Sequence, residues 1–172
     1  MNTPDADAGL WLAGSPARSP RAADSRPDAE RIDHILLTLR RALAQLEGIV
    51  PVNAELLERN STAGLVVERV LANLVEMAFG INSHSTRVMS GRKPDSFRES
   101  CLCAVEFGMI DPDLAAALVP ADGLPHIAMQ LCLDAEPEQV ESVVDRTLSA
   151  YQEYERQVIE WATSRRNRPA AS

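Results

Sequence analysis

The chain has few cysteines and no long apolar run, and each shortage excludes a class of protein. Its three cysteines, Cys101, Cys103 and Cys132, are odd in number and too sparse for a secreted disulfide framework, so reduced thiols are expected. No stretch approaches the roughly 20 consecutive apolar residues of a membrane-spanning helix. The first residues are acidic where a signal peptide would be basic. These features predict a cytoplasmic protein.

Basic charge is also scarce. The chain carries 17 Lys and Arg against 25 Asp and Glu, a formal net charge of −8 at pH 7. The average field of such a chain repels nucleic acid, because binding there depends on neutralising phosphates. RNA is therefore disfavoured as the ligand of a free-standing binding module. An RNase that acts through a few local arginines, or a domain that docks on a basic partner, remains open.

Helical periodicity begins after a polar leader. Residues 1–27 contain four prolines and no sustained apolar period, which predicts a disordered leader. From residue 28 to residue 164 apolar side chains recur at steps of three and four, and no stretch alternates with the period of a strand. Residues 165–172 form a polar tail. The sequence predicts an all-α fold, an antiparallel bundle of four or five main helices.

Apolar stripes define the first helix and the longest one. The first is expected to end at Gly48 and Pro51, before a short helical turn at residues 54–59, and the longest is expected from Thr62 to Val88. The two stripes consist of Ile32, Ile35, Leu36, Leu39, Leu43 and Leu46, and of Val66, Val70, Leu74, Met77, Ile81, His84 and Val88. Helices this long offer more apolar surface than one small bundle usually hides, which favours a symmetric homodimer.

Capping residues place the remaining helices. Asp95 is expected to cap a helix that Gly108 ends, and Asp111, followed by proline, to cap a short helix through residue 118. Pro125 suits the first turn of a further short helix through residue 133. Pro137 opens the last helix. The inward stripe of that last helix is Val140, Val144, Leu148, Tyr151, Tyr154, Val158 and Trp161.

Three segments follow one another in a distinctive order and spacing. They run from Val67 to His84, from residue 93 to residue 100 and from residue 106 to residue 115. In this order they resemble the long helix, the next helix start and the Gly-turn-helix of HepT-like toxins, part of the HEPN superfamily, and the resemblance covers residues 31–162. It implies a HEPN-like homodimer with a metal-independent RNase site between protomers. It also implies a nucleotidyltransferase antitoxin that transfers AMP onto a motif tyrosine. Neither a cofactor nor a resident metal is implied.

The catalytic motif of that family falls on residues 123–132, where its reactive residues are replaced. In HepT-like toxins the segment is approximately Gly-Leu-Arg-Asn-x-x-x-His-x-Tyr. By this match Pro125 stands for the arginine, His126 for the asparagine, Gln130 for the histidine and Cys132 for the tyrosine. The resemblance therefore implies a degenerate Arg-x4-His-x-Tyr motif.

The replaced residues supply the chemistry of the reaction. Metal-free RNA cleavage needs a group that titrates near neutrality, which histidine provides, and a fixed cation for the phosphoryl oxygens, which arginine provides. Gln130 cannot exchange protons near pH 7, and Pro125 has neither charge nor donor. Cys132 has no phenolic hydroxyl to accept AMP. The match implies a site impaired both as an RNase and as a target of modification.

Other residues could replace the missing groups. His126 could keep an acid–base role, although a polar residue at a helix start is the simpler interpretation. His84 lies on the apolar stripe and is more simply a core histidine. Arg98, with Arg92 and Lys93, could touch phosphate, although such a cluster is usually a solvated loop. Cys101 and Cys103 point about 200° apart on a helix and cannot easily chelate one metal.

Two functions remain open. The first is a HepT-like component of a toxin–antitoxin module that is catalytically impaired and acts by binding a nucleotidyltransferase-type antitoxin or as a dimeric scaffold. The alternative is an active, metal-independent RNase toxin that uses non-standard residues such as His84, His126 or Arg98.

Overall fold

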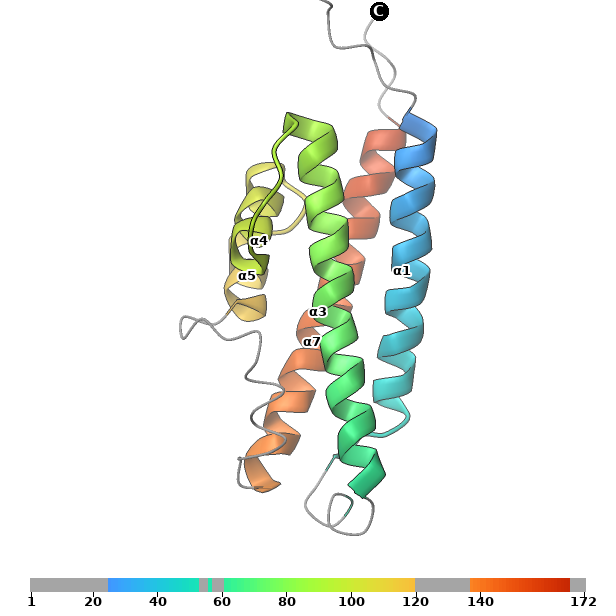
Figure 1. The fold of residues 1–172 in the computed structure, drawn as a ribbon, viewed down its shortest axis with the longest axis vertical. Helices are drawn as coiled ribbons and strands as arrows, with labels where there is room; N and C mark the ends of the chain where they lie inside the picture. Colours follow the sequence, from blue (N-terminus) through green and yellow to red (C-terminus); the bar gives the residue numbers. More distant parts are fainter. Residues whose placement is uncertain (1–24, 53–55, 57–60, 120–136, 168–172) are drawn as a thin grey trace, which may run out of the picture.

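The computed structural model describes residues 25–52, 56, 61–119 and 137–167, which contain five α-helices and no strand (Figure 1). The helices are α1 (Ser25–Glu47), α3 (Ser61–Ser90), α4 (Phe97–Glu106), α5 (Pro112–Leu118) and α7 (Pro137–Arg166). The all-α fold predicted from the sequence is confirmed. None of the described helices is long and apolar enough to cross a membrane.

Three long helices form the body of the bundle, and α1 is antiparallel to the other two. In Figure 1, α1 runs downwards, whereas α3 and α7 run upwards. Helix α1 packs against both α3 and α7, while α4 packs against α3 and α5, and α5 against α7. The short pair α4 and α5 therefore covers one side of the bundle, opposite α1.

Polar pairs fix the register of α1 against α7. Residue numbers rise along α1 as they fall along α7, as an antiparallel pair requires. The three pairs are Asp33 with Arg166 at 2.9 Å, Arg40 with Glu155 at 2.6 Å, and Glu47 with Gln152 at 2.6 Å. Such exposed pairs contribute at most about 1 kcal/mol each, so they specify the register more than they stabilise it.

The core lies mostly on the predicted stripes. Side chains at Leu39, Leu74, Ile81, Val144 and Tyr151 are buried, and Ile35 is partly buried. The stripe of the longest helix contains two errors, because Val66 and Val88 are exposed at 42% and 46%.

The inward face of α3 is offset by one residue from the predicted stripe near its start and ends on polar residues. Val67 takes the buried place expected for Val66, so the true stripe is displaced by about 100° around the helix at this end. At the other end Ser85 and Thr86 are buried while the apolar Val88 faces outward. The apolar pattern alone could not show this exchange.

Most helix ends agree with the sequence. Asp111 caps α5 by accepting from the Leu114 amide at 2.7 Å, as predicted, and α7 begins at Pro137. The cap of α4 is Ser96 and not Asp95, since the Ser96 hydroxyl accepts from the Glu99 amide at 3.1 Å. Helix α1 begins at Ser25, three residues before the helical pattern of the sequence. The expected turn at 54–59, apart from residue 56, and the expected helix through residue 133 lie outside the described residues.

Candidate functional site

The four motif positions cannot be placed from the described part of the chain. Pro125, His126, Gln130 and Cys132 all fall within residues 120–136, outside the described ranges. The segment begins after Val119, the C-cap residue of α5, and ends where α7 begins. The described helices therefore fix only where this segment enters and leaves the bundle.

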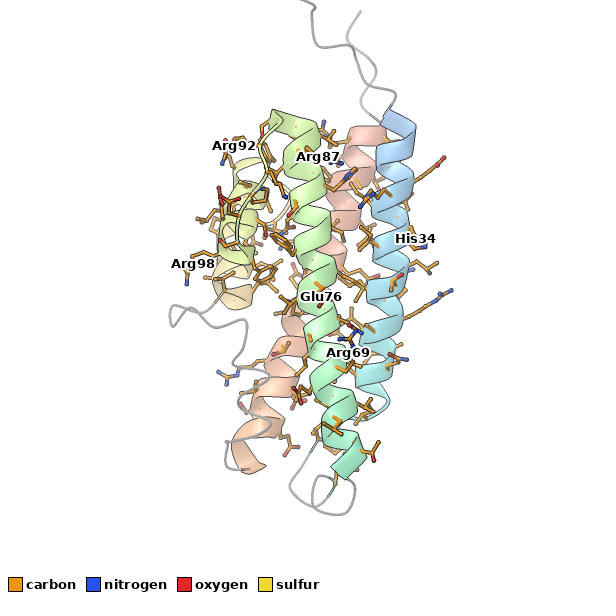
Figure 2. The ribbon with its side chains drawn as sticks, in the orientation of Figure 1. His34, Arg69, Glu76, Arg87, Arg92 and Arg98 are labelled. Carbon is orange, nitrogen blue, oxygen red and sulfur yellow. The ribbon has the colours of Figure 1, made fainter. Side chains whose placement is uncertain are left out.

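Two of the possible substitutes for the motif residues, His84 and Arg98, lie on different helices and differ in exposure. His84 lies on α3 with only 7% of its surface exposed, so its imidazole is largely withdrawn from solvent. Arg98 lies in the first turn of α4, is exposed, and points away from the bundle (Figure 2). One of these candidates is therefore a largely buried imidazole, and the other is an exposed guanidinium that points outward.

The basic cluster after α3 is spread out as well. Arg92 pairs with Glu106 at 3.2 Å and donates to the Cys103 sulfur at 3.3 Å, so its guanidinium is held against α4. Arg92 and Arg98 lie at different heights along the bundle (Figure 2). Lys93 is exposed in the connecting segment. The described positions of these residues do not converge on one phosphate.

A buried polar cluster joins α3, α4 and α7. The Tyr154 hydroxyl donates to Asn82 Oδ1 at 2.7 Å and also lies 3.3 Å from the Ala78 carbonyl oxygen. The Asn82 amide in turn donates to the Ser100 hydroxyl at 3.3 Å and to the Cys101 sulfur at 3.6 Å. Asn82, Ser100 and Tyr154 are fully buried. Asn82 therefore makes interhelical hydrogen bonds within the core.

The ionisable groups of this cluster, and of Tyr151 beside it, are held in their neutral forms. Burial raises the pKa of the Cys101 thiol from 9.0 to about 12. Burial also raises the pKa of the Tyr151 and Tyr154 phenols above the usual value of 10.0. A buried thiol with a raised pKa is a poor nucleophile. The cluster is suited to fixing the helices in one arrangement and not to catalysis.

The cysteines of α4 occupy separate environments. Cys101 faces Asn82, whereas Cys103 accepts from Arg92, and both are buried while Leu102 between them is 62% exposed. Across the described ranges, no three His, Cys, Asp or Glu side chains are grouped so that they could hold a metal ion.

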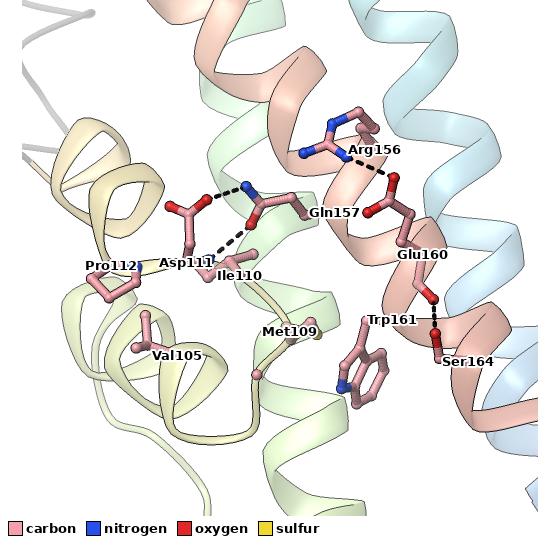
Figure 3. Close-up of a pocket in the computed structure, with 11 residues that line it drawn as sticks. Val105, Met109, Ile110, Asp111, Pro112, Arg156, Gln157, Glu160, Trp161 and Ser164 are labelled. Carbon is pink, nitrogen blue, oxygen red and sulfur yellow. Dashed lines mark hydrogen bonds and ion pairs between the residues drawn. The ribbon is translucent and has the colours of Figure 1, made fainter. Parts of the chain in front are cut away.

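A groove of about 720 Å³ lies between the α4–α5 corner and the last turns of α7 (Figure 3). Its apolar surface comes from Val105, Met109, Ile110, Pro112 and Trp161, and its polar rim from Asp111, Arg156, Gln157, Glu160 and Ser164. Gly108 turns the chain at this corner with a φ of 65°, a conformation that side chains other than glycine rarely adopt. The groove is therefore built where the backbone reverses.

Two side chains of α7 hold the corner in place. The Gln157 amide accepts from the Asp111 amide nitrogen at 2.8 Å and donates to the Asp111 carboxylate at 2.5 Å. The Trp161 indole donates to the Phe107 carbonyl at 3.2 Å, and the Arg165 guanidinium lies 5.2 Å from the centre of its ring. The sequence stripe included Trp161, but nothing in the sequence indicated the contact between Gln157 and Asp111.

The chemistry of the groove favours binding over catalysis. Its lining contains no histidine or cysteine. Arg156 pairs with Glu153 and Glu160, and the hydrogen bonds from Arg156 and Gln157 lower the pKa of Glu153 to about 2. The same pairing raises the pKa of Arg156. Arg156 thus offers a fixed positive charge beside an apolar wall.

The arrangement of long and short helices is the fold of HEPN toxins in solved toxin–antitoxin complexes. One match is to a chain of a toxin–antitoxin complex with AMP-PNP, with a TM-score of 0.63, 20% identity, and coverage of 74% of this chain and 96% of that chain. Another is to a chain in the structure of the tri-AMPylated Shewanella oneidensis HEPN toxin in complex with MNT antitoxin, with a TM-score of 0.63, 19% identity, and coverage of 75% and 96%. At such identities these matches show the fold.

In sequence, the chain is similar to a protein named tRNA nuclease HepT from Aphanizomenon flos-aquae (strain 2012/KM1/D3). The two are 28% identical over 95 residues, which cover 55% of this chain and 64% of the relative, just under two thirds of its length. No protein-family model matches the chain. The resemblance to HepT-like toxins of the HEPN superfamily is thus confirmed by sequence and by fold.

Proposed function

We propose that this protein is the toxin-family component of a toxin–antitoxin module and that it acts by binding a nucleotidyltransferase-type antitoxin. The observation that carries the proposal is the combination of a HEPN toxin fold with a motif that has lost its arginine and its histidine. A solved toxin of this fold is in complex with an MNT antitoxin, and its coverage of 96% means that nearly the whole domain has a counterpart here. The surface for such a partner is therefore expected to be retained.

We infer that catalysis is impaired. Proline at 125 cannot stabilise charge on a phosphoryl oxygen, and glutamine at 130 cannot transfer a proton near pH 7. Loss of one charge-stabilising donor commonly costs about 10²- to 10³-fold in rate, so loss of both roles leaves little activity. The described residues support this inference, because His84 on α3 is largely buried, whereas Arg98 on α4 is exposed and points away from the bundle (Figure 2).

The test is an RNA cleavage assay on the purified protein and on the double variant Pro125→Arg plus Gln130→His. The wild type should cleave RNA slowly or not at all, and the double variant should gain activity because it regains both the cation and the acid–base group. The single variants are the matched controls, since each restores only one role. Rapid cleavage by the wild type would refute the proposal of impairment.

Regulation by modification should be lost together with catalysis. The solved toxin chain is tri-AMPylated, whereas here Cys132 stands where the family has the motif tyrosine. Co-expression with a nucleotidyltransferase partner, followed by intact mass measurement, should show a stable complex and no added AMP. An AMP adduct mapped to any side chain between Gly123 and Asp134 would contradict this expectation.

The alternative function is an active RNase toxin, and the observation in its favour is the name of the sequence relative, tRNA nuclease HepT. A moved active site would use His84, His126 or Arg98. Expression of the wild type alone should then arrest bacterial growth, and His84→Ala, His126→Ala or Arg98→Ala should relieve the arrest. The impaired protein should slow growth little.

We also expect a homodimer, which a dimeric scaffold role would require. Sedimentation at tens of micromolar would detect it, and a clean monomer would contradict it.

A further inference from the structure

The groove between the α4–α5 corner and α7 has the features of a peptide-docking site. Its volume of about 720 Å³ lies in the range typical of ligand pockets. Its wall carries the indole of Trp161, which is only partly buried, and its rim carries fixed charges of both signs (Figure 3). We propose that this groove binds the apolar segment Leu10–Ala13 of the same chain, with Trp11 as its anchor. This inference is independent of the proposed function.

The composition of the leader supports this occupant. The run Leu10-Trp11-Leu12-Ala13 is flanked by Gly9 and Gly14 and lies in a segment rich in Pro, Ser, Asp and Arg. Full burial of one large apolar side chain stabilises by about 1.5–3 kcal/mol. Aromatic side chains also gain from pairing with another ring at an offset or an edge. Burial of three large apolar side chains against an apolar wall that contains an indole is therefore favourable.

The place where α1 begins brings this segment within reach of the groove. Helix α1 starts at Ser25, at the same end of the bundle as the last turns of α7 that carry Trp161 (Figure 1). The pair between Asp33 and Arg166 ties these two helix ends together. Twelve residues separate Leu12 from Ser25, and at roughly 3.3 Å per residue they can span about 40 Å. A whole helix of 30 residues measures about 45 Å, so the tether can pass around the end of the bundle.

Tethering is what favours this segment over a separate peptide. A short tether raises the effective concentration of a linked ligand to roughly millimolar. The tethered segment can therefore occupy the groove in most protein molecules even where its affinity is too weak to hold a separate peptide.

Arg165 beside the groove and two aspartates of the leader carry charges of opposite sign. Asp5 and Asp7 precede the apolar run, and Arg165, stacked on Trp161, has no carboxylate partner within the described ranges. An ion pair between one of these aspartates and Arg165 would add to the apolar contact.

The chain contains only two tryptophans, which makes the test direct. Full-length protein labelled with 5-fluorotryptophan should give two fluorine resonances, assigned with Trp11→Phe. We expect the Trp11 resonance to show a smaller solvent isotope shift between H2O and D2O than a synthetic peptide of residues 1–20. We also expect Trp11→Ala to move the Trp161 resonance and to increase its solvent isotope shift.

Substitutions in the groove complete the experiment. Val105→Arg should release Trp11 by placing charge on the apolar wall. Ser164→Glu on the exposed rim should weaken the interaction without a change in the core, because it places negative charge where Asp5 and Asp7 are expected. Leu65→Ala is the control, since Leu65 is 64% exposed near the start of α3 and should leave both resonances unchanged. A wild-type Trp11 resonance equal to that of the free peptide would overturn the proposal, as would a Trp161 resonance that ignores Trp11→Ala. Protection of Trp11 that disappears on serial dilution would assign the segment to a second copy and also overturn it.

Discussion

The Tyr154 hydroxyl links α7 to α3 through a hydrogen bond that one substitution can remove. The ring is fully buried, and the hydroxyl donates to Asn82 Oδ1 at 2.7 Å. Tyr154→Phe keeps the ring and deprives that buried acceptor of its donor. An unsatisfied buried acceptor costs about 1–3 kcal/mol. We therefore expect the free energy of unfolding to fall by about 2 kcal/mol and the thermal midpoint by roughly 4–8 °C.

Tyr151 provides a matched control one turn earlier on the same helix. Its ring is 3% exposed and meets the Tyr154 ring edge to face, with centroids 6.3 Å apart. Its hydroxyl is buried and has no hydrogen-bond partner in the described part of the chain. Tyr151→Phe deletes the same atom but relieves an unsatisfied polar group. We expect the free energy of unfolding to stay unchanged or to rise.

Urea denaturation followed by far-UV circular dichroism measures both variants. All samples should be compared at one protein concentration, because the midpoint of an oligomer depends on concentration. The double variant Tyr154→Phe plus Asn82→Ala should be less destabilised than the sum of the single variants, since both remove one interaction. Equal losses for Tyr154→Phe and Tyr151→Phe, or additive losses in the double variant, would refute the argument that the hydroxyl contact stabilises the bundle.

Three further outcomes follow from local geometry. The free energy of unfolding should decline as pH rises from about 9 towards 12, because folding raises the pKa of Cys101 and the thiol of the unfolded chain ionises first. Thermal melts at a series of pH values should show a shallower decline for Cys101→Ala. Asp111→Ala should lower the urea midpoint by an amount equivalent to about 1 kcal/mol through loss of the α5 cap, and Asp111→Asn should preserve most of it. Gly108→Ala should cost about 1–2 kcal/mol because its φ is 65°, whereas an equal midpoint would disprove that backbone argument.

The helices were predictable because periodicity and caps are local properties of a sequence. Asp111 followed by Pro112 located the start of α5, and Pro137 located the start of α7. The phase of α3 was less certain, because Val66 and Val67 are equally apolar neighbours and only packing chooses between them. At the far end of α3, polar Ser85 is buried and apolar Val88 is exposed, contrary to any hydrophobic pattern.

The site was less predictable than the fold. The replacement of the motif residues at Pro125 and Gln130 was visible in the sequence alone, given the family resemblance. The groove could not be predicted from the sequence. Gln157 and Asp111 are 46 residues apart in the chain, and a glutamine on a helix surface gives no sign of its partner. The same holds for the contact of Tyr154 with Asn82, which depends on how two helices cross.

The edge between α1 and α7 also imposes an order on synthesis. Its three polar pairs join residues 133, 115 and 105 positions apart in the chain. A ribosome adds about 5–20 residues per second, so roughly 5–25 s separate the synthesis of α1 from the synthesis of the α7 residues that pair with it. During that interval α1 can pack only on α3, and the side that will meet α7 stays open. A nascent chain can therefore complete its bundle only after α7 has left the ribosome, so the folding of the whole domain depends on the synthesis of its last helix.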